Sequence, residues 1–240
     1  MHLFEFMDLK TTPVSLKRLL RESLEFVLDA NKYYDFVCAE IENLHNQHHY
    51  NQIIELGAGQ APLSKRLSEK PWTSQLTLVP CDLYPIENHY KHLQTSYRNI
   101  KPILKPIDFS KPHDWPKNSL LVISASFHHI HPKYKEEIVT TILKNGDLVI
   151  AEPLRQNFLS YMISITNFFT ILFFSLFNYQ QGWLKRVFWC IPLPIAPLIF
   201  VWEGFVSALR QSYLKDWSNL EDSKTTYFFQ FLFFKRSQSS

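Results

Sequence analysis

The chain has 240 residues, 46% of them apolar and 20% charged, so it can bury a core and is not disordered as a whole. Its net charge of +3 is small and scattered, which argues against a nucleic-acid partner. Cys38, Cys81 and Cys190 form no CxxC pair, so the cysteines indicate neither a zinc knuckle nor a disulfide framework and fit a cytoplasmic protein. The first ten residues lack the apolar run of a signal peptide.

The N-terminal region is predicted to be helical. Leucines and valines recur at helical spacing from residue 14, behind Pro13, and a second helical stretch covers residues 35–44. A polar loop is expected at 45–51. We therefore expect residues 1–48 to form a helical cap.

Short apolar runs then alternate with helical stretches. We predict strands at residues 52–56, 76–80, 103–107, 119–125 and 147–151. We predict helices between them at residues 61–67, 87–97 and 133–143. This alternation is typical of an α/β fold with a doubly wound, mostly parallel sheet and helices on both faces.

A glycine-rich turn, Gly57-Ala58-Gly59, joins the first strand to a helix, where backbone can approach a ligand closely. Asp82 ends the next strand, where a carboxylate can accept hydrogen bonds from both ribose hydroxyls. Pro62 stands where a dinucleotide motif has its third glycine. Glu55 would repel a pyrophosphate but suits a sulfonium ligand with a cationic amino group. The alternative is a tight turn that binds nothing.

These motifs resemble those of class I S-adenosylmethionine-dependent methyltransferases over residues 50–152. The resemblance implies a Rossmann-like sheet of the seven-stranded type and S-adenosylmethionine as cofactor. The cofactor-binding residues that it implies are Glu55, Gly57, Ala58, Gly59, Asp82, Leu83, Asp108, Phe109 and Ser126. The chain departs from the family at Ala61, where many members have a third glycine. It also shows one C-terminal strand, 226–234, where the family ends in two.

A narrower likeness lies outside this core. The segment Trp202-Glu203-Gly204-Phe205-Val206-Ser207-Ala208-Leu209-Arg210 with Tyr213, together with Phe4-Glu5-Phe6 and Asp8, is similar to a little-characterised group of bacterial methyltransferase-like proteins. That group has the motif W-[DE]-G-x-V-S-x-L-R, usually with Asp where Glu203 stands. The likeness implies no substrate.

Histidines follow the fourth strand, at the sheet edge where this fold binds ligands. His128 or His129 could act as a general base during methyl transfer, or both could only shape the pocket. The spacing of these two and His131 does not aim three ligands at one metal, so no metal site is predicted.

Acceptor-binding residues are expected in the same region and near the C-terminus. Phe127 and Glu152 lie at the ends of the fourth and fifth strands. Arg210 and Tyr213 could position a polar acceptor head, although Arg210 could instead pair with Glu203.

Residues 156–202 form an apolar insertion after the fifth strand. Its first part, residues 158–177, carries no charge and is long enough to match the hydrocarbon thickness of a bilayer. Three prolines interrupt the second part, and tryptophans flank both. The insertion could lie in one leaflet, form a lid over a lipophilic pocket, or span the membrane. A single span is disfavoured because both ends must return to one domain.

We expect one domain over residues 1–240, with the cap at 1–48, the cofactor-binding core at 49–155, the insertion at 156–202 and the rest of the fold at 203–240. The predicted function is methyl transfer from S-adenosylmethionine to a small lipophilic acceptor at or near the membrane. The protein would be cytoplasmic, peripheral or monotopic at the inner face, and would contact the membrane through residues 157–202. The alternative is a non-catalytic S-adenosylmethionine-binding or membrane-anchored interaction protein. A nicotinamide-dependent oxidoreductase is disfavoured by Glu55 and Pro62.

Overall fold

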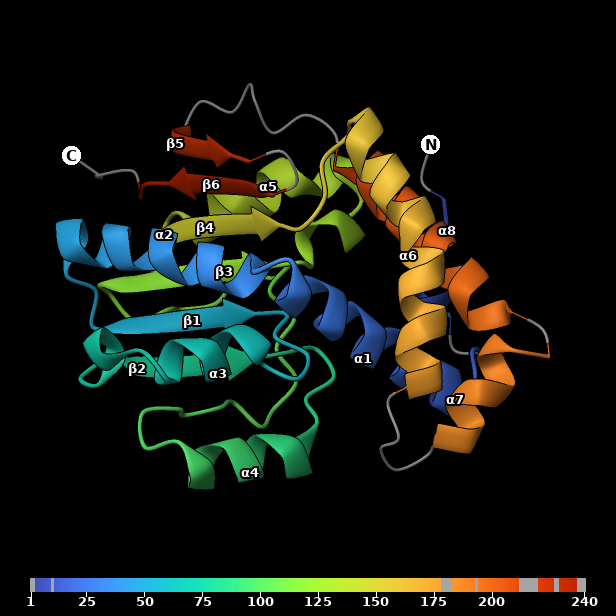
Figure 1. The fold of residues 1–240 in the computed structure, drawn as a ribbon. Coiled ribbons are helices and arrows are strands. Elements are labelled where there is room, and N and C mark those ends of the chain that lie inside the picture. Colours follow the sequence, from blue (N-terminus) through green and yellow to red (C-terminus); the bar gives the residue numbers. More distant parts are fainter. Residues whose placement is uncertain are drawn as a thin grey trace. The chain divides into compact units, whose positions relative to one another are not determined.

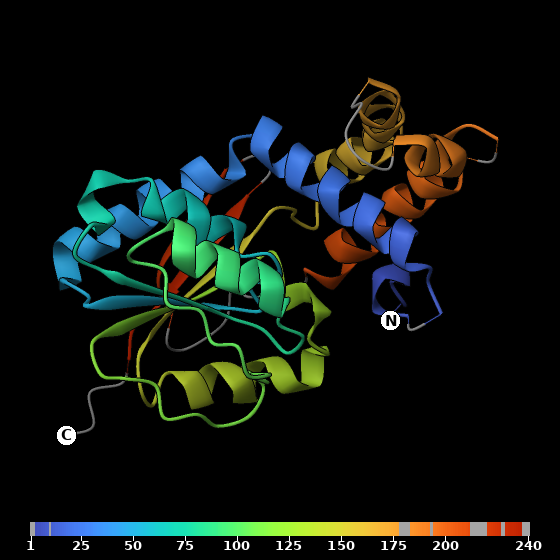
Figure 2. The same cartoon turned by 90° about the horizontal axis from the view of Figure 1, so that it is seen from below.

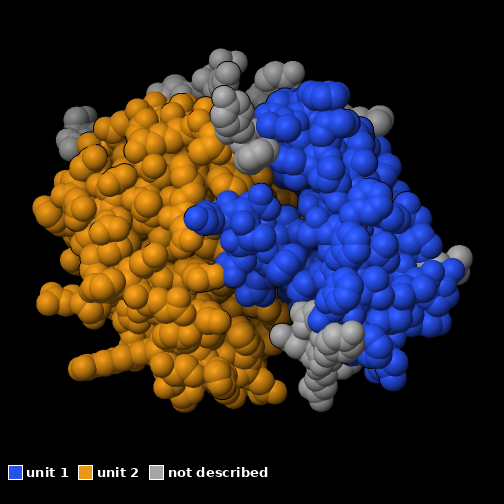
Figure 3. Space-filling view, in the orientation of Figure 1, with its two compact units in different colours: residues 1–32, 154–212 blue, residues 33–153, 213–240 orange. Residues whose placement is uncertain are grey.

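A computed structural model describes residues 3–9, 11–177, 183–192, 194–211, 220–226 and 229–236. The chain divides into two compact units, coloured separately in Figure 3. The helical unit comprises residues 1–32 and 154–212, and the sheet unit comprises residues 33–153 and 213–240. The predicted cap is thus divided after residue 32, and the unit that contains the insertion continues past residue 202.

A six-stranded sheet forms the centre of the sheet unit, in the order β2-β1-β3-β4-β6-β5 (Figure 1). The strands are β1 (Gln52–Leu56), β2 (Thr77–Cys81), β3 (Ser119–Ser124), β4 (Asp147–Glu152), β5 (Leu220–Thr225) and β6 (Gln230–Phe234). The first four strands are parallel, whereas β6 runs antiparallel to both β4 and β5. The predicted mostly parallel, Rossmann-like sheet is confirmed.

Helices cover both faces of this sheet (Figure 2). The helix α5 (Pro132–Ile142) packs on the face formed by Ile54, Leu56 and their neighbours in β3 and β4. On the other face lie α2 (Tyr33–His48) and α3 (Pro62–Ser68), while α4 (Glu87–Ser96) follows β2. Because the central strands are covered on both faces, they read as continuous apolar runs.

The strand predicted at residues 103–107 is wrong. In its place the chain makes one parallel bridge beside β2, between Leu78 and Ile100, and then runs on irregularly. Ile103 and Ile107 still donate to the carbonyls of Pro80 and Asp82, at 3.0 and 2.8 Å. Pro80 of β2 has no N–H group to donate in return, so a regular ladder does not continue along this segment. The sheet therefore has six strands rather than the seven that the resemblance implies.

The C-terminal prediction of one strand over residues 226–234 is also corrected. The structure has two strands here, β5 and a shorter β6, paired as an antiparallel hairpin. The sequence of β5, LEDSKT, is exposed on nearly every residue and has no apolar alternation, which explains why it was missed. The loop predicted at residues 45–51 is shorter than expected, because α2 continues to His48.

The helical unit contains α1 (Val14–Ala30), α6 (Phe158–Phe177), α7 (Trp183–Cys190) and α8 (Ile195–Arg210). Leucines of α1 pack with apolar residues of α6, α7 and α8 in a core of their own. Within the unit, α6 and α8 lie side by side (Figures 1 and 2). The helix predicted over residues 158–177 is confirmed, and the interrupting prolines fall between α7 and α8 or in the first turn of α8.

Among the described residues, α6 is the one helix that by itself is long and apolar enough to cross a membrane. Its most apolar stretch has a mean hydropathy of 1.6, and 22% of that stretch is buried. The helices α7 and α8 pass the same test only as a pair bent by 74°. A core helix of a soluble protein also passes this test, but most of such a helix is buried.

Candidate cofactor-binding edge

The turn after β1 has left-handed backbone at three alternate positions. Gly57, Gly59 and Ala61 have φ angles of 65°, 55° and 56°. A Cβ on Gly57 would lie 3.0 Å from Oγ of Ser126 and 3.2 Å from the Phe109 ring. No described atom lies within 4 Å of the corresponding position on Gly59. The turn is therefore closed on one side by Ser126 and Phe109 and is open at Gly59, where backbone is exposed to a ligand.

Asp82 holds this turn from the end of β2. Its Oδ2 accepts a hydrogen bond of 2.8 Å from the backbone N–H of Gly59, and its Oδ1 accepts one of 2.7 Å from Tyr84. Each carboxylate oxygen can accept a second hydrogen bond, so Asp82 can still bind a pair of hydroxyls. The backbone N–H of Ala58 donates to the carbonyl of Cys81, which fixes β1 and β2 together at this edge.

Glu55 lies buried between the end of β1 and the start of α3. Its Oε2 accepts hydrogen bonds from the backbone N–H and the hydroxyl of Ser64, at 2.9 and 2.5 Å. The carboxylate therefore caps α3, whose N-cap residue Ala61 makes no side-chain cap. Burial raises the pKa of Glu55 to about 7, while the hydrogen bonds from Ser64 oppose that shift. Glu55 thus orders the start of α3, and its contact with a ligand's amino group stays a prediction.

Ser126 is the clearest unsatisfied group at this edge. It follows Ala125, which has a φ angle of 51°, and its hydroxyl is buried with no hydrogen-bond partner among the described residues. A buried polar atom without a partner is costly unless a ligand or water completes its bonding.

Asp108 directly precedes Phe109 in the sequence. Its carboxylate accepts hydrogen bonds from the hydroxyl and the N–H of Ser110, and these bonds lower the pKa of Asp108.

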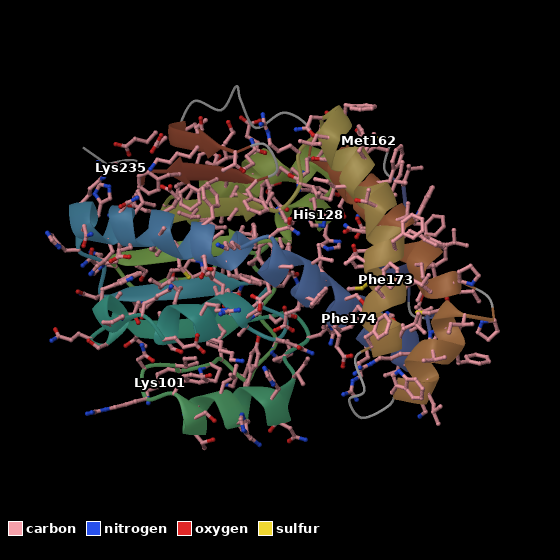
Figure 4. All side chains as sticks on the ribbon, in the orientation of Figure 1. Lys101, His128, Met162, Phe173, Phe174 and Lys235 are labelled. Atoms are coloured by element: carbon pink, nitrogen blue, oxygen red, sulfur yellow. The ribbon has the colours of Figure 1, made fainter. Side chains whose placement is uncertain are left out.

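His128 and Glu152 form a buried pair at the ends of β3 and β4 (Figure 4 labels His128). The distance from Nδ1 of His128 to Oε2 of Glu152 is 2.8 Å. The other oxygen, Oε1, accepts the backbone N–H groups of Phe127 and His128 at 2.8 and 3.2 Å. Because a carboxylate only accepts, Nδ1 carries the proton and Nε2 is the basic nitrogen.

This pair distinguishes the two candidate histidines. His129 is exposed, and its ring stacks near that of His128 at 4.3 Å between centroids. His131 caps α5 by accepting the N–H of Lys133, so it serves the helix. Among the candidates, His128 has the orientation expected of a general base.

Sequence reasoning missed two residues that order this edge. Tyr33, at the start of α2, donates to the carbonyl of Ala151 at 2.8 Å and bonds Oγ of Ser124 at 3.1 Å. His89 of α4 donates through Nε2 to the carbonyl of Gln60 at 2.8 Å. Both contacts join segments far apart in sequence, so no local pattern could have indicated them.

Leu83, Arg210 and Tyr213 stay predictions as site residues. Leu83 follows Asp82 and is exposed. Tyr213 lies outside the described residues. Arg210 belongs to the helical unit, where Nη1 is 2.9 Å from Oε1 of Glu5 and Nη2 donates to the carbonyl of Leu3.

The segment of α8 that carries the narrower motif holds the N-terminus of the chain. Glu203 accepts the N–H groups of Phe6 and Met7 at 2.5 and 3.2 Å. Trp202 donates to the carbonyl of Phe4 at 3.0 Å, and Ser207 bonds Glu5 at 3.3 Å. The two pieces of the motif lie near opposite ends of the chain and contact each other within the helical unit.

No family model matches this chain, and no curated protein sequence matches it. Several solved structures are similar to it. Human N-acetylserotonin methyltransferase in complex with S-adenosylmethionine is similar with a TM-score of 0.52 at 11% identity, over 92% of this chain and 55% of the human chain. A putative S-adenosylmethionine-dependent methyltransferase from Methanococcus maripaludis has a TM-score of 0.49 at 13% identity, over 91% and 93% of the two chains. Magnesium protoporphyrin IX methyltransferase from Synechocystis, with bound S-adenosylhomocysteine, has a TM-score of 0.47 at 10% identity, over 96% and 91%.

Of these three, the human enzyme alone has a TM-score above 0.5, and this chain spans about half its length. At such low identity the likeness concerns the fold. The chain has the Rossmann-like fold found in class I S-adenosylmethionine-dependent methyltransferases.

Proposed function

We propose that this chain is a methyltransferase that binds S-adenosylmethionine at the carboxyl edge of its sheet. The observation that carries the proposal is the turn between β1 and α3. It exposes backbone at Gly59, is held by Asp82, and faces the buried hydroxyl of Ser126. A tight turn without a ligand would not need a buried hydroxyl left without a partner.

Each residue of this edge would have a defined part in binding. The remaining lone pairs of Asp82 would accept the two ribose hydroxyls, and the backbone of Gly57, Ala58 and Gly59 would approach the amino-acid end. The hydroxyl of Ser126 would complete its bonding there. Leu83, Asp108 and Phe109 would line the adenine side, as the resemblance to the family implies. Glu55 would contribute by capping α3 rather than by contact.

Bound S-adenosylmethionine supplies an electrophilic methyl group. The chain would supply alignment and a base for the acceptor. Nε2 of His128 would take the proton from an O–H, N–H or S–H nucleophile as the methyl group moves. Glu152 would act as a positioning residue, since it fixes the tautomer and the ring plane of His128 and stabilises the imidazolium that forms. Phe127, whose N–H also binds Glu152, would support the same geometry.

We further propose a small lipophilic acceptor and a position at the cytoplasmic face of a membrane. The support is the apolar character and the exposure of α6. We assign Arg210 to holding the N-terminal segment, because its guanidinium is engaged with Glu5 and Leu3. Tyr213 remains a candidate for acceptor binding.

Titration calorimetry of the full chain with S-adenosylmethionine and with NAD tests the cofactor. We expect binding of S-adenosylmethionine alone, and binding of NAD alone would overturn the proposal. Formation of S-adenosylhomocysteine on incubation with a cell lipid extract then tests catalysis. Cofactor binding without any product would favour the alternative, a non-catalytic binding protein.

Variants of the dyad test the mechanism. His128→Gln should lower turnover by about a hundredfold to ten-thousandfold and leave cofactor affinity nearly unchanged. Glu152→Gln should lower kcat and leave the KM for S-adenosylmethionine nearly unchanged, whereas a purely structural loss would raise that KM as well. His92→Gln, at an exposed histidine of α4, is the matched control. A larger loss in His129→Gln than in His128→Gln would assign the base to His129.

A further inference from the structure

The exposed surface of α6 is apolar along its whole length. Large apolar side chains recur there at intervals of three or four residues, so they form one stripe on the helix. We call this set the apolar stripe; it consists of Phe158, Met162, Ile165, Phe169, Phe173 and Phe177. Phe158 and Phe169 are 75% and 59% exposed, which is far more than a core helix would allow. Figure 4 shows Met162 and Phe173 at separate points along this helix.

The buried face of α6 consists of three serines and one large apolar residue, Ile171, which packs in the core of the helical unit. Ser160, Ser164 and Ser175 are all buried, on the side opposite the apolar stripe. Their hydroxyls are bonded within the unit: Ser160 accepts the N–H of Arg155, Ser164 donates to the carbonyl of Ser160, and Ser175 bonds Cys190. The packing there is close, since a Cβ on Gly204 of α8 would lie 2.7 Å from Oγ of Ser164.

This arrangement reverses the polarity of a helix that faces water. In water, the phenylalanines would be buried and the serines exposed, because burial of each large apolar side chain contributes about 1.5–3 kcal/mol. Small residues between helices and large apolar residues outside are the pattern of helices that face lipid. An apolar patch of this extent on a protein surface indicates a binding face.

A groove adjoins the apolar stripe. It has a volume of about 620 Å³ and is lined by Phe26 of α1 and by Thr170, Phe173, Phe174 and Phe177 of α6. The rings of Phe26 and Phe174 lie 4.8 Å apart at its wall. An aromatic groove with one hydroxyl suits a flexible hydrocarbon chain better than a polar ligand.

The charged residues of α1 limit which side of the helical unit can contact lipid. The helix α1 packs on α6, α7 and α8, and it carries charged residues along its outer face. Arg186 of α7 pairs with Glu22 of α1 at 2.8 Å, and Glu22 also binds the exposed Arg18. A bilayer that surrounded these helices would place the charges of α1 in hydrocarbon, which is costly.

We propose that the apolar stripe and the adjoining groove bind the acyl chains of one membrane leaflet, with α6 lying in the plane of the membrane. This inference rests on the membrane position proposed above and specifies its surface. A lipid surface fits better than a second copy of the chain, because the helical unit has nine Lys and Arg against six Asp and Glu. Its net charge of +3 repels its own copies and attracts anionic headgroups.

Fluorescent labels measure this docking directly. The three native cysteines are buried, so an environment-sensitive thiol dye can be attached to Met162→Cys, Phe173→Cys or, as the control on α5, Tyr134→Cys. On phosphatidylcholine vesicles containing phosphatidylglycerol, the two α6 labels should shift to the blue and the control should not. A nitroxide on the acyl chain should quench both α6 labels equally. Both labels lie equally far from the middle of α6, so a third label at the exposed Phe169→Cys, near the middle, is needed. For a helix in the membrane plane it should be quenched like the other two. Much stronger quenching of this label by a nitroxide at the chain end would indicate a spanning helix and overturn the in-plane proposal.

Serine substitutions provide the second test. Phe169→Ser, Phe173→Ser and Phe177→Ser together should weaken sedimentation with these vesicles by at least a hundredfold. The matched control replaces exposed apolar residues outside the stripe, Val14, Leu104 and Tyr134, by serine, and it should sediment like the wild type. The proposal would be overturned if the wild-type protein did not bind the vesicles. It would also be overturned if the protein formed a dimer in which the α6 labels were shielded from water in the absence of lipid. Calorimetry with S-adenosylmethionine on the same samples shows separately whether the proposed function fails.

Discussion

The sheet unit and the helical unit place polar and apolar side chains in opposite ways. In β1, β3 and β4 the aliphatic residues are almost fully buried, and the polar groups gather where the strands end. In α6 the phenylalanines point outward, and serines fill the contact with α8 and α7. Twelve of the 20 phenylalanines belong to the helical unit.

This difference separates two functions within one chain. A buried sheet with polar groups at one edge orders those groups for a ligand, as Asp82 and Glu152 show. A helix with an apolar exterior orders nothing at its surface but offers area to a partner that excludes water. Changes in the sheet unit should therefore alter ligand binding, and changes in the helical unit should alter stability or membrane attachment.

The largest effect is expected at Gly57. Gly57→Val should abolish S-adenosylmethionine binding, because a β-branched residue is strained at a φ of 65° and its Cβ would crowd Ser126. Calorimetry on a variant that still unfolds cooperatively checks this. Tight binding by a folded Gly57→Val protein would mean that the ligand lies elsewhere, and the assignment of functions to the two units would fail.

The next largest effect is a loss of stability, which is expected in the helical unit. Arg210→Met should lower the free energy of unfolding by about 3–5 kcal/mol, because it removes the guanidinium that lies 2.9 Å from the buried carboxylate of Glu5. Arg18→Met breaks an exposed pair on α1 and should cost less than about 1 kcal/mol. Urea unfolding measures both. Equal losses, or weakened acceptor turnover in a stable Arg210→Met protein, would return Arg210 to the substrate site.

The sequence predicted most of the sheet unit because its signals are local. Buried parallel strands appear as short apolar runs, and the turn after β1 has a glycine pattern that a ligand site requires. The strand at 103–107 was wrong because its regularity depends on the neighbouring strand, where Pro80 has no N–H group to donate to it. The hairpin strand β5 was missed because its exposed residues have no alternation.

Pairings across the chain were beyond sequence reasoning. Glu152 was expected to bind an acceptor or to cap the next segment, whereas it holds His128 from the neighbouring strand. Arg210 was weighed against the nearby Glu203, whereas its partner Glu5 lies at the other end of the chain. Three serines of α6 are buried against the neighbouring helices, and the sequence alone does not show which of its polar residues face inward.

A moderate effect is expected at Asp82. Asp82→Ala should weaken S-adenosylmethionine binding at least tenfold, because a charge-assisted hydrogen bond contributes about 1.5–3 kcal/mol. Asp82→Asn can still accept the N–H of Gly59, so it should lose less. Asp114→Ala is the control for loss of a carboxylate. Unchanged affinity in a folded Asp82→Ala protein would remove Asp82 from the site.

The smallest effect concerns the pH dependence of stability through Glu55. Burial raises the pKa of this carboxyl to about 7 in the folded chain, against 4.5 for an ordinary glutamate. The folded state therefore holds the proton more tightly than the unfolded state over this interval. Stability from this group is present at low pH and is lost as pH rises from about 4.5 through 7.

Glu55→Gln should remove that part of the dependence and keep the cap, because an amide oxygen can still accept the N–H of Ser64. Between pH 6 and pH 8, wild-type protein should lose about 1 kcal/mol more stability than the variant. Urea unfolding at the two pH values measures the difference, in which other titrating groups cancel. Parallel losses would mean that Glu55 is already ionised at pH 6, and its carboxylate would then be available to a cationic ligand after all.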